Sequence, residues 1–454
     1  MRMNLQTIKK LSLRTLITAC LMAPGVAMAQ QPAMQFHRPY DKTGINTFET
    51  TKTDTTPFTG LKVRIGGAFE QVYQDLSDQN YVTNTNGEPI ANAMKTKADS
   101  GNVLTPLSNN FDLAMANMYL DAQLADGVRV NVTLYLASHH HTDTWVKNGY
   151  IQFDKLPFLH SSFFDGLMQY LTIDIGQLEV DYGDAHYRRS DGGNGMYNPF
   201  IENYIMDEFS TEVGGEVYFH SNGFLAMVGA TNGQLNPNIT KITAIDKKTG
   251  DTASMDPAIL AKIGYDDQVN SDLRIRLTGS LYTESSSPGM ELFGGDRTGS
   301  RYVDVVDNAG NPFDGRFNPG FSNAVTTFMI NPFIKYDGLE FFGTYESANG
   351  RTWAETDTRN ATQLAGDLIY RFGSNENFWV GVRYNTVKAQ LAPVSANIPD
   401  ITINRIAASL GWFLTDNIMA KAEYVDQQYK DFPATDIRNG AQFNGVMIDA
   451  AIGF

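Results

Sequence analysis

A strict alternation of apolar and polar residues recurs along this chain and constrains its fold more than any other feature. In the segment 128–136 every second residue is Val or Leu, and Arg, Asn, Thr and Tyr lie between them. The segments 61–70 and 272–281 show the same pattern. Successive side chains of a β-strand point to opposite faces, so this alternation predicts strands with one apolar and one polar face.

Alternating segments number about sixteen, an even count, as bacterial membrane barrels require. The predicted strands are 61–75, 110–124, 128–138, 145–154, 170–178, 210–219, 224–231, 269–282, 291–302, 324–336, 339–346, 362–372, 378–388, 401–414, 418–427 and 443–454. The strand at 291–302 is the weakest of the set, because the segment 285–299 is rich in glycine. The connection 155–169 is predicted to be an unusually long turn.

The predicted connections differ in length on the two sides of the sheet. Tight turns with residues that suit them are expected at 125–127, 220–223, 337–338, 374–377 and 415–417. Long connections are expected at 76–109, 180–209, 232–268, 303–323 and 428–442. Short periplasmic turns and long extracellular loops are typical of an outer-membrane barrel. The fold class predicted is therefore all-β, a transmembrane antiparallel β-barrel of about 16 strands.

The first 29 residues differ from the rest of the chain. They contain four basic residues, an apolar run from Leu16 to Val26 and the small-residue end Ala27-Met28-Ala29. This order predicts a secretory signal peptide over 1–29. The polar, threonine-rich segment 30–60 is expected to be a periplasmic N-terminal tail, since it is too short for a plug domain. The barrel is then expected to span 61–454.

Composition excludes several other classes of protein. The only cysteine, Cys20, lies in the predicted signal, so disulfides and cysteine–zinc sites are not expected in the mature chain. Without the signal, 31 Lys and Arg remain beside 50 Asp and Glu, a net charge of −19, which argues against nucleic acid as a partner. No apolar run approaches the ~18 residues of a transmembrane helix.

Aromatic residues gather next to the predicted short turns, where a membrane barrel places an interfacial girdle. They are Tyr336, Tyr370, Phe372, Phe378, Trp379, Trp412 and Phe413. The chain also ends in an alternating segment, 446–454, that closes on Phe454. Such an end resembles the signal by which outer-membrane proteins are recognised for insertion. The expected partners are therefore outer-membrane lipid and the insertion machinery.

Taken together, the chain resembles a sixteen-stranded porin of the Gram-negative outer membrane. The more specific pieces of the resemblance are Tyr182-Gly183-Asp184-Ala185-His186-Tyr187-Arg188-Arg189, Asn331-Pro332-Phe333, Gly381-Val382-Arg383-Tyr384-Asn385 and Ala422-Glu423-Tyr424-Val425. These pieces are similar to porins grouped with the phosphate-selective type. The resemblance implies a homotrimer and a water-filled channel for passive diffusion of small hydrophilic solutes and ions.

The segment 180–209 is the third connection on the side of the long loops in the strand count, between the fifth and sixth strands. The resemblance implies that this third loop folds into the barrel and narrows it. The residues expected at this constriction are Asp184, His186, Arg188, Arg189, Asp191 and Glu202. The wall opposite is expected to present four lumen-facing bases from the twelfth to fifteenth strands, namely Arg371, Arg383, Arg405 and Lys421.

Other functions remain open from the sequence. A substrate-specific channel, for an anion such as phosphate or another small solute, would use the same wall, and the long loops would suit a structural or adhesive barrel. Asp184 and His186 resemble a catalytic pair, but no serine motif accompanies them, so no enzyme and no cofactor are expected. Neighbouring strand residues point to opposite faces, so at most two of His139-His140-His141 can converge, and no metal site is expected.

Overall fold

The structure is a computed structural model that describes residues 31–83, 89–91, 102–137, 144–308, 310–311, 313–392 and 399–454. The predicted signal peptide 1–29 and the run His139-His140-His141 lie outside these residues. Among the described residues, no helix is both long and apolar enough to cross a membrane.

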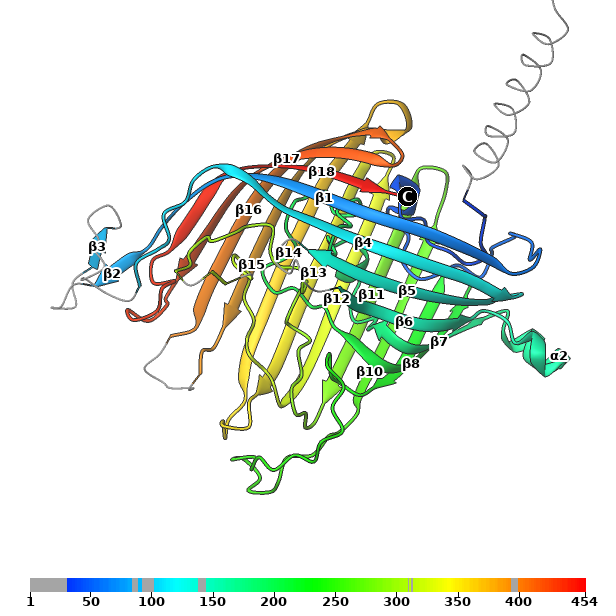
Figure 1. The fold of residues 1–454 in the computed structure, drawn as a ribbon, viewed down its shortest axis with the longest axis horizontal. Coiled ribbons are helices and arrows are strands. Elements are labelled where there is room, and N and C mark those ends of the chain that lie inside the picture. The colour runs from blue at the N-terminus through cyan, green and yellow to red at the C-terminus, as the bar shows by residue number, and fades with distance from the viewer. Residues whose placement is uncertain are drawn as a thin grey trace, which may run out of the picture.

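In the described part of the chain, sixteen strands form one closed antiparallel barrel (Figure 1). Each strand pairs with its neighbours in the sequence, and β1 pairs with both β4 and β18 to close the ring. The barrel strands are β1 (Lys62–Gln79), β4 (Asn110–Ala125), β5 (Val128–Ala137), β6 (Trp145–Phe153), β7 (Leu171–Glu179), β8 (Thr211–Ser221), β9 (Phe224–Thr231), β10 (Ala258–Gln268), β11 (Leu273–Glu284), β12 (Ala324–Tyr336), β13 (Leu339–Arg351), β14 (Arg359–Phe372), β15 (Phe378–Ala389), β16 (Ile401–Thr415), β17 (Ile418–Lys430) and β18 (Gln442–Gly453).

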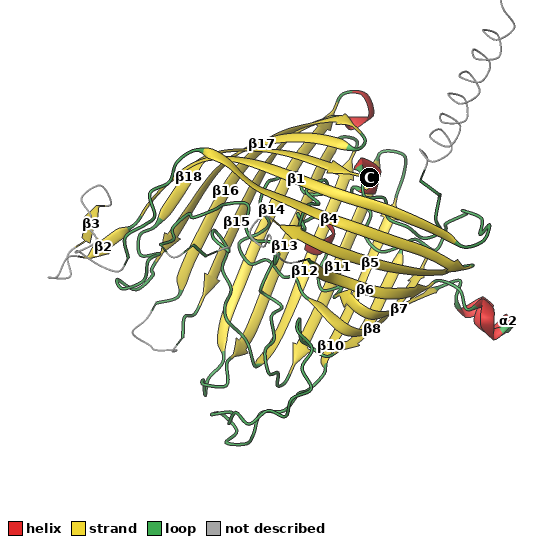
Figure 2. Ribbon diagram, viewed as in Figure 1, coloured by secondary structure: helices red, strands yellow, loops and turns green. Residues whose placement is uncertain are grey.

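Little other secondary structure accompanies the barrel (Figure 2). A small hairpin, β2 (Tyr81–Thr83) with β3 (Pro89–Ala91), lies in the first long connection. The described helices are short: η1 (Lys42–Gly44), η4 (Pro157–Leu159), α2 (Ser162–Leu167), η5 (Ala185–Tyr187) and η6 (Ser374–Glu376). The turn that contains η4 and α2 projects from the barrel (Figure 1). We call the barrel end that carries this turn the short-turn end, and the opposite end the long-loop end.

The alternation places polar side chains inside the barrel and apolar ones outside. On β14, Gln363, Asp367 and Arg371 are buried, whereas Leu364 and Leu368 between them are about half exposed. Other strands repeat this order, so an apolar surface surrounds the ring. A closed barrel leaves no unpaired strand edge, which is the condition for a sheet to span a membrane. The prediction of a transmembrane antiparallel barrel is confirmed.

The strand count is correct, although one strand was misplaced. Residues 291–302, predicted as the ninth strand, form no strand, and the described residues between Glu284 and Ala324 belong to a single long connection. The missing member is β10, which lies inside the predicted loop 232–268. Its inner face carries the buried Leu260 between the apolar Ile259 and Ala261, and this hides the alternation.

An aromatic row follows the short-turn end. Tyr370, Phe372, Phe378 and Trp412 are exposed on the outer surface, with successive ring centroids 5.7–5.9 Å apart. Trp379 was predicted to belong to this row but is wrongly assigned, as is Phe413. Both are buried inside the barrel and pack against each other at 5.1 Å, because they occupy lumen-facing positions of their strands.

The barrel interior is filled by three segments that are not strands. These are the N-terminal segment 31–60, the connection 180–210 between β7 and β8, and the connection 285–323 between β11 and β12. Their buried apolar side chains pack with inward-facing residues of the wall in the main hydrophobic clusters. Figure 2 shows these loops passing within the ring of strands. The interior is thus packed, and any passage through it must run between these segments and the wall.

The N-terminal segment, predicted to be a periplasmic tail, is folded against the inside of the barrel. Gln35 is buried, and its backbone amide donates to Gln123 Oε1 at 3.0 Å near the β4–β5 turn. The backbone amide of Lys42 donates to Asp416 O at 2.9 Å on the far side of the ring, and Asn46 bonds Glu340 at 2.7 Å. The segment therefore crosses the short-turn end. Its buried Met34, Phe36 and Phe48 supply the apolar contacts that its polar composition concealed.

Candidate functional site

The connection 180–210 lies across the barrel interior. None of its residues is exposed. Its backbone amides donate to side chains on the opposite wall: Ile201 to Glu423 at 2.8 Å, and Ile205 to Asn385 at 2.7 Å. Gly183 adopts φ 75°, and a Cβ there would lie 2.3 Å from Met329 Sδ, so the loop enters the barrel through a turn that only glycine fits.

Three of the four predicted wall bases hold this connection in place. Arg383 donates to Glu202 O at 2.8 Å, and Arg405 donates to Asn203 O at 2.6 Å. Lys421 donates to the carbonyls of Gly195, Asn198 and Phe200 at 2.9–3.2 Å. The fourth base, Arg371, bonds Glu340 at 3.2 Å. The three donors satisfy loop carbonyls that have no strand partner, which is the requirement for irregular backbone inside a barrel.

Three of the six predicted constriction residues are also taken up in buried contacts. Asp184 accepts from Arg276 at 2.8 Å, and Arg188 pairs with Glu340. Glu202 accepts from Ser300 at 2.7 Å; burial opposes its ionisation, but Arg316 and Arg301 outweigh this and lower its pKa to about 2. These groups are ionised and compensated, so they fasten the connection to its surroundings.

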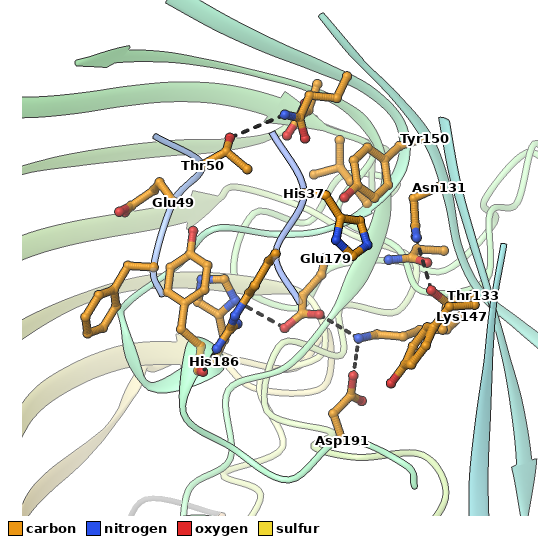
Figure 3. A pocket seen from close by; sticks show the side chains of 18 of the residues that line it. His37, Glu49, Thr50, Asn131, Thr133, Lys147, Tyr150, Glu179, His186 and Asp191 are labelled. Carbon is orange, nitrogen blue, oxygen red and sulfur yellow. Dashed lines mark hydrogen bonds and ion pairs between the residues drawn. The ribbon is translucent and has the colours of Figure 1, made fainter. Parts of the chain in front are cut away.

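The other three predicted residues, His186, Arg189 and Asp191, border an internal cavity of about 220 Å³. The cavity lies between one side of the 180–210 connection, the N-terminal residues His37 to Thr50, and the inner faces of β4 to β8 (Figure 3). The open passage was expected between this connection and the wall of β14 to β17, which carries the four predicted bases. The 180–210 connection packs against that side, so the remaining space lies along the opposite wall.

Charges of both signs line the cavity. The bases are Arg38, Arg129, Lys147 and Arg189, and the acids are Glu49, Asp174, Glu179, Asp191 and Glu216. Lys147 lies at the centre of the group: its Nζ is 2.7 Å from Glu179 Oε2 and also bonds Asp191 (Figure 3). Lys147 is not among the predicted site residues, because a register shift between β5 and β6 interrupts the alternation there.

His186 borders the cavity and also contacts the buried Asp181. Its Nδ1 is 3.1 Å from Glu179 and its Nε2 is 2.8 Å from Asp181. Burial disfavours the imidazolium, but the two carboxylates outweigh it, and the pKa of His186 is raised. Asp181 also bonds Lys262. The charged groups around His186 are therefore paired with one another, and the side chains that border the cavity stay polar.

Six tyrosines border the same space: Tyr40, Tyr119, Tyr150, Tyr187, Tyr197 and Tyr218. The rings of Tyr40 and Tyr119 stack with centroids 3.7 Å apart, and Tyr40 Oη donates to Asp121 at 2.9 Å. Arg38 lies over the Tyr197 ring at 3.8 Å. The lining thus combines aromatic faces with charged and hydroxyl groups, a combination that accommodates water and small polar solutes.

The connection 285–323 is the interior segment that the strand pattern concealed most completely. Arg301 is fully buried, pairing with Asp296 at 2.7 Å and Glu70 at 2.9 Å. Its backbone amide donates to Glu202, so this connection supports the tip of the 180–210 connection from the long-loop side. The sequence predicted its second half, 303–323, as a long connection, and the glycine-rich composition of 285–299 was the signal in its first half.

Three comparisons with known proteins were made for the chain. No family model matches the chain, and no curated protein matches it. Among solved structures, the anion-selective porin from Comamonas acidovorans is similar, with 10% identity over 87% of this chain and 100% of that chain at a TM-score of 0.48. The outer membrane channel DcaP of Acinetobacter baumannii has 11% identity over 88% of this chain and 99% of that chain, also at 0.48. OmpT, an outer membrane protein of Vibrio cholerae, has 10% identity over 88% and 99% at 0.46.

The structure itself defines the class: a closed antiparallel barrel of sixteen strands with an apolar outer surface and a polar, segment-filled interior. This is the architecture of a bacterial outer-membrane β-barrel.

Proposed function

We propose that this protein is an outer-membrane channel that lets small hydrophilic solutes and ions diffuse passively along the β4–β8 wall. The observation that carries the proposal is the cavity that polar and charged side chains line between the 180–210 connection and the β4–β8 wall. Sixteen strands enclose a lumen wide enough for an aqueous channel unless something narrows it. Here the three interior segments narrow it and leave the space bordered by Lys147, His186 and Asp191.

The narrowing element in this proposal is the 180–210 connection. Its side chains Arg189, His186 and Asp191 border the passage, whereas Asp184, Arg188 and Glu202 fix its position. Arg383 and Arg405 also act as anchors, because their donors are directed at loop carbonyls. Ion preference is then decided mainly by the charges of β5, β6 and the connection itself.

Single-channel recording of the purified protein in a planar bilayer tests the proposal, with Lys147→Gln as the informative variant. Removing this cation leaves Glu179 and Asp191 without their shared partner in a narrow space where charges are poorly screened. The reversal potential in a salt gradient should shift toward cation preference. Lys388→Gln is the matched control, since Lys388 is 63% exposed outside the cavity and should leave the potential unchanged.

Two outcomes would contradict the proposal. Absence of channels from folded wild-type protein would favour a structural or adhesive barrel. Equal reversal potentials for wild type, Lys147→Gln and Lys388→Gln would mean that the conducting path avoids the β4–β8 wall.

A substrate-specific channel is the second candidate, and the six tyrosines of the lining favour it. Aromatic rings provide flat contact surfaces that a general diffusion pore does not need. The lining charges are nearly balanced in sign, which gives no support to a preference for phosphate. Saturable block of the ion current by neutral sugars, or alternatively by phosphate, would identify a specific site and its class of solute, whereas unsaturable effects would leave the general channel.

The assembly proposed is a homotrimer embedded in outer-membrane lipid, as the resemblance to porins implies. Light scattering of the detergent-solubilised protein measures its mass directly. A monomeric mass in several detergents would contradict the trimer without affecting the proposed channel.

A further inference from the structure

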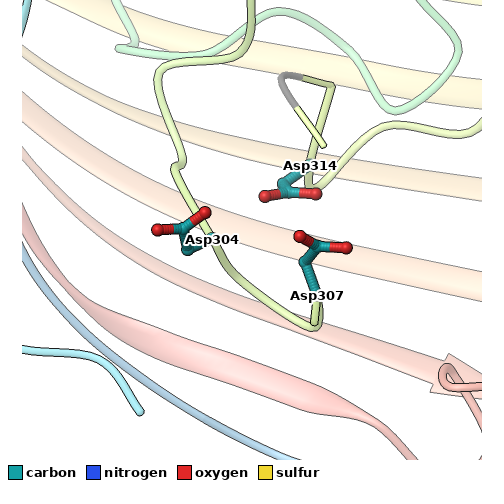
Figure 4. Close-up of side chains that lie close together, drawn as sticks. All are labelled: Asp304, Asp307 and Asp314. Carbon is teal, nitrogen blue, oxygen red and sulfur yellow. The ribbon is translucent and has the colours of Figure 1, made fainter. Parts of the chain in front are cut away.

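Three aspartates at the long-loop end of the barrel do not border the proposed passage. Asp304, Asp307 and Asp314 lie close together, with carboxylate oxygens within 4.8 Å of one another (Figure 4). The carboxylate of Asp307 accepts from the backbone amides of Gly310 and Asn311, the latter at 3.0 Å, as aspartates in loops commonly do. A group of acidic side chains in a loop does not by itself indicate a ligand, and we infer none there.

The turn between β6 and β7 differs from the other turns of the short-turn end in its length and in its exposed side chains. This turn, 154–170, contains η4 and α2 and projects from the barrel (Figure 1). Six large apolar side chains of the turn are 36–71% exposed: Phe158, Leu159, Phe163, Phe164, Leu167 and Tyr170. Large groups of exposed apolar side chains are uncommon on surfaces that water covers, and they indicate contact with a partner or a membrane.

Helix α2 carries its apolar residues on one face. At ~3.6 residues per turn, the side chains of Phe163, Phe164, Leu167 and Met168 fall on one side of the helix. The only charged residue of the helix, Asp165, falls on the other side and is exposed. Met168 is 3% exposed, so one edge of the apolar face is buried while the rest is not. A helix of six residues has little stability of its own, and cover of the exposed face from outside the chain would stabilise it.

The exposed side chains of the turn continue the outer surface of the barrel. The ring of Phe158 contacts the ring of Phe153 at the end of β6, with centroids 6.1 Å apart. The ring of Tyr170 stacks on Phe219 of β8, also at 6.1 Å, and both side chains are exposed. Tyr170 and Phe219 lie at the short-turn end, as does the exposed aromatic row of β14 to β16. Such aromatic residues mark the level of the membrane interface, so the turn begins and ends at that level.

We propose that the turn 154–170 is a membrane anchor whose apolar face enters the periplasmic leaflet of the outer membrane. The partner is a phospholipid surface, and helices of this kind lie in its plane with the apolar face about 5–10 Å deep, at the boundary of headgroups and acyl chains. Asp165, on the opposite face, remains in water. Helix α2 contains no Lys or Arg, so apolar contact rather than attraction to anionic lipid holds it in place.

A second copy of the chain would be a different cover for the same face. The contacts of the turn favour lipid, because Phe158 and Tyr170 pack on Phe153 and Phe219, which belong to the outer surface of the barrel wall. The apolar surface of the wall therefore extends onto the turn without a break. The inference does not depend on the proposed channel, because a structural or adhesive barrel would lie in the same membrane.

Nitroxide labelling of single-cysteine variants tests the anchor, since the only natural cysteine, Cys20, lies in the predicted signal peptide. Leu167→Cys and Asp165→Cys place the label on the two faces of α2, both at exposed positions. The labelled proteins are folded into vesicles of phosphatidylethanolamine and phosphatidylglycerol. The Leu167→Cys label should be more accessible to oxygen, which concentrates among acyl chains, than to the water-soluble complex NiEDDA. The Asp165→Cys label is the matched control and should show the reverse order.

A second variant tests whether the aromatic side chains hold the turn in lipid. Adding Phe163→Ser and Phe164→Ser to Leu167→Cys removes exposed rings outside the barrel wall, and the label should then lose its preference for oxygen. The proposal is overturned if that preference persists, or if the Leu167→Cys label alone is as accessible to NiEDDA as the Asp165→Cys label. It is also overturned if the Leu167→Cys label is shielded from both reagents and its spectrum is broadened by a second label, which would assign the face to contact between two copies of the chain.

Discussion

His186 lies between the carboxylates of Glu179 and Asp181 inside the barrel, and Lys147 shares Glu179 and also pairs with Asp191. At the scale of residues, charged side chains inside this barrel often contact two oppositely charged partners at once. Removing one partner of a buried pair leaves the other uncompensated, which is costlier than losing a surface ion pair. Single substitutions here should therefore change both stability and the electrostatics of the cavity.

The raised pKa of His186 predicts a pH dependence of stability. Since the folded state holds the proton more tightly than the unfolded state, the contribution of His186 is fully present below pH 6.5 and is lost as the pH rises through the raised pKa. The stability difference between wild type and His186→Gln should therefore shrink as the pH is raised above 6.5. Thermal unfolding from pH 5.5 to 9 measures it.

His37 provides the control for this prediction. Burial lowers its pKa, so its contribution has the opposite sign: the folded state loses stability as the pH falls below the unfolded value of 6.5. The difference between wild type and His37→Gln should change at the acid end of the same series. Identical profiles for the two variants would contradict the assignment of charge to His186.

A second residue-scale prediction concerns the two faces of β5. Val132 lies midway along the strand on the outer face, whereas Thr133 is buried and borders the cavity. Val132→Arg places a charge in lipid and should cost about 2–4 kcal/mol near the bilayer midplane. Thr133→Arg points toward the polar interior and should cost less. Folded fractions in lipid vesicles compare them, and greater damage from Thr133→Arg would show that the faces are assigned the wrong way round.

At the scale of elements, periodicity identified strands well and interior segments poorly. Fifteen of the predicted segments overlap barrel strands, because a strand with one lipid face must alternate. The pattern did not predict β10, because Leu260 places an apolar side chain on the inner face of that strand. The pattern wrongly predicted a strand at 291–302, where Leu292, Phe293 and Tyr302 are buried without belonging to a strand. These three side chains belong to a loop that packs inside the barrel. Local alternation does not distinguish apolar side chains that face lipid from apolar side chains of such a loop.

The candidate site was less predictable than the fold, for a related reason. Alternation shows which wall residues face inward but not which of them meet a loop. Arg405 is bonded to Asn203, about two hundred positions away in the chain, so only the folded structure reveals that it is an anchor. The side of the lumen left open also depends on where the 180–210 connection packs, which no local pattern encodes.

The N-terminal segment gives the prediction at this scale. Residues His37 to Thr50 border the cavity and cross the short-turn end. Deleting residues 31–59 should therefore increase single-channel conductance, because it widens the proposed passage at that end. Deleting Pro237–Lys241, an exposed stretch of a long loop, serves as the control and should leave conductance at the wild-type value. Unchanged conductance in a folded 31–59 deletion would mean that the narrowest point lies elsewhere.

At the scale of the whole molecule, closure of the ring is the event on which everything else depends. β1 and β18 are the first and last barrel strands, so the seam between them cannot form until the entire chain is available. The inward connections then bond to walls on both sides of the ring. A barrel that fails to close has an open edge, which lipid does not tolerate.

Deletion of Phe454 tests this dependence. Its amide donates to Gly67 O at 3.0 Å, and Gly67 N donates to Phe454 O at 3.1 Å, so the terminal residue completes the seam. Its ring is half exposed on the outer surface, where it also resembles an insertion signal. We expect the deletion to lower the amount of folded protein in the outer membrane sharply, while the molecules that do fold conduct as wild type. Phe378→Ala removes another exposed aromatic from the short-turn end without touching the seam, and its folded yield should stay close to normal. Equal yields for the two variants would show that Phe454 contributes only lipid contact and not closure.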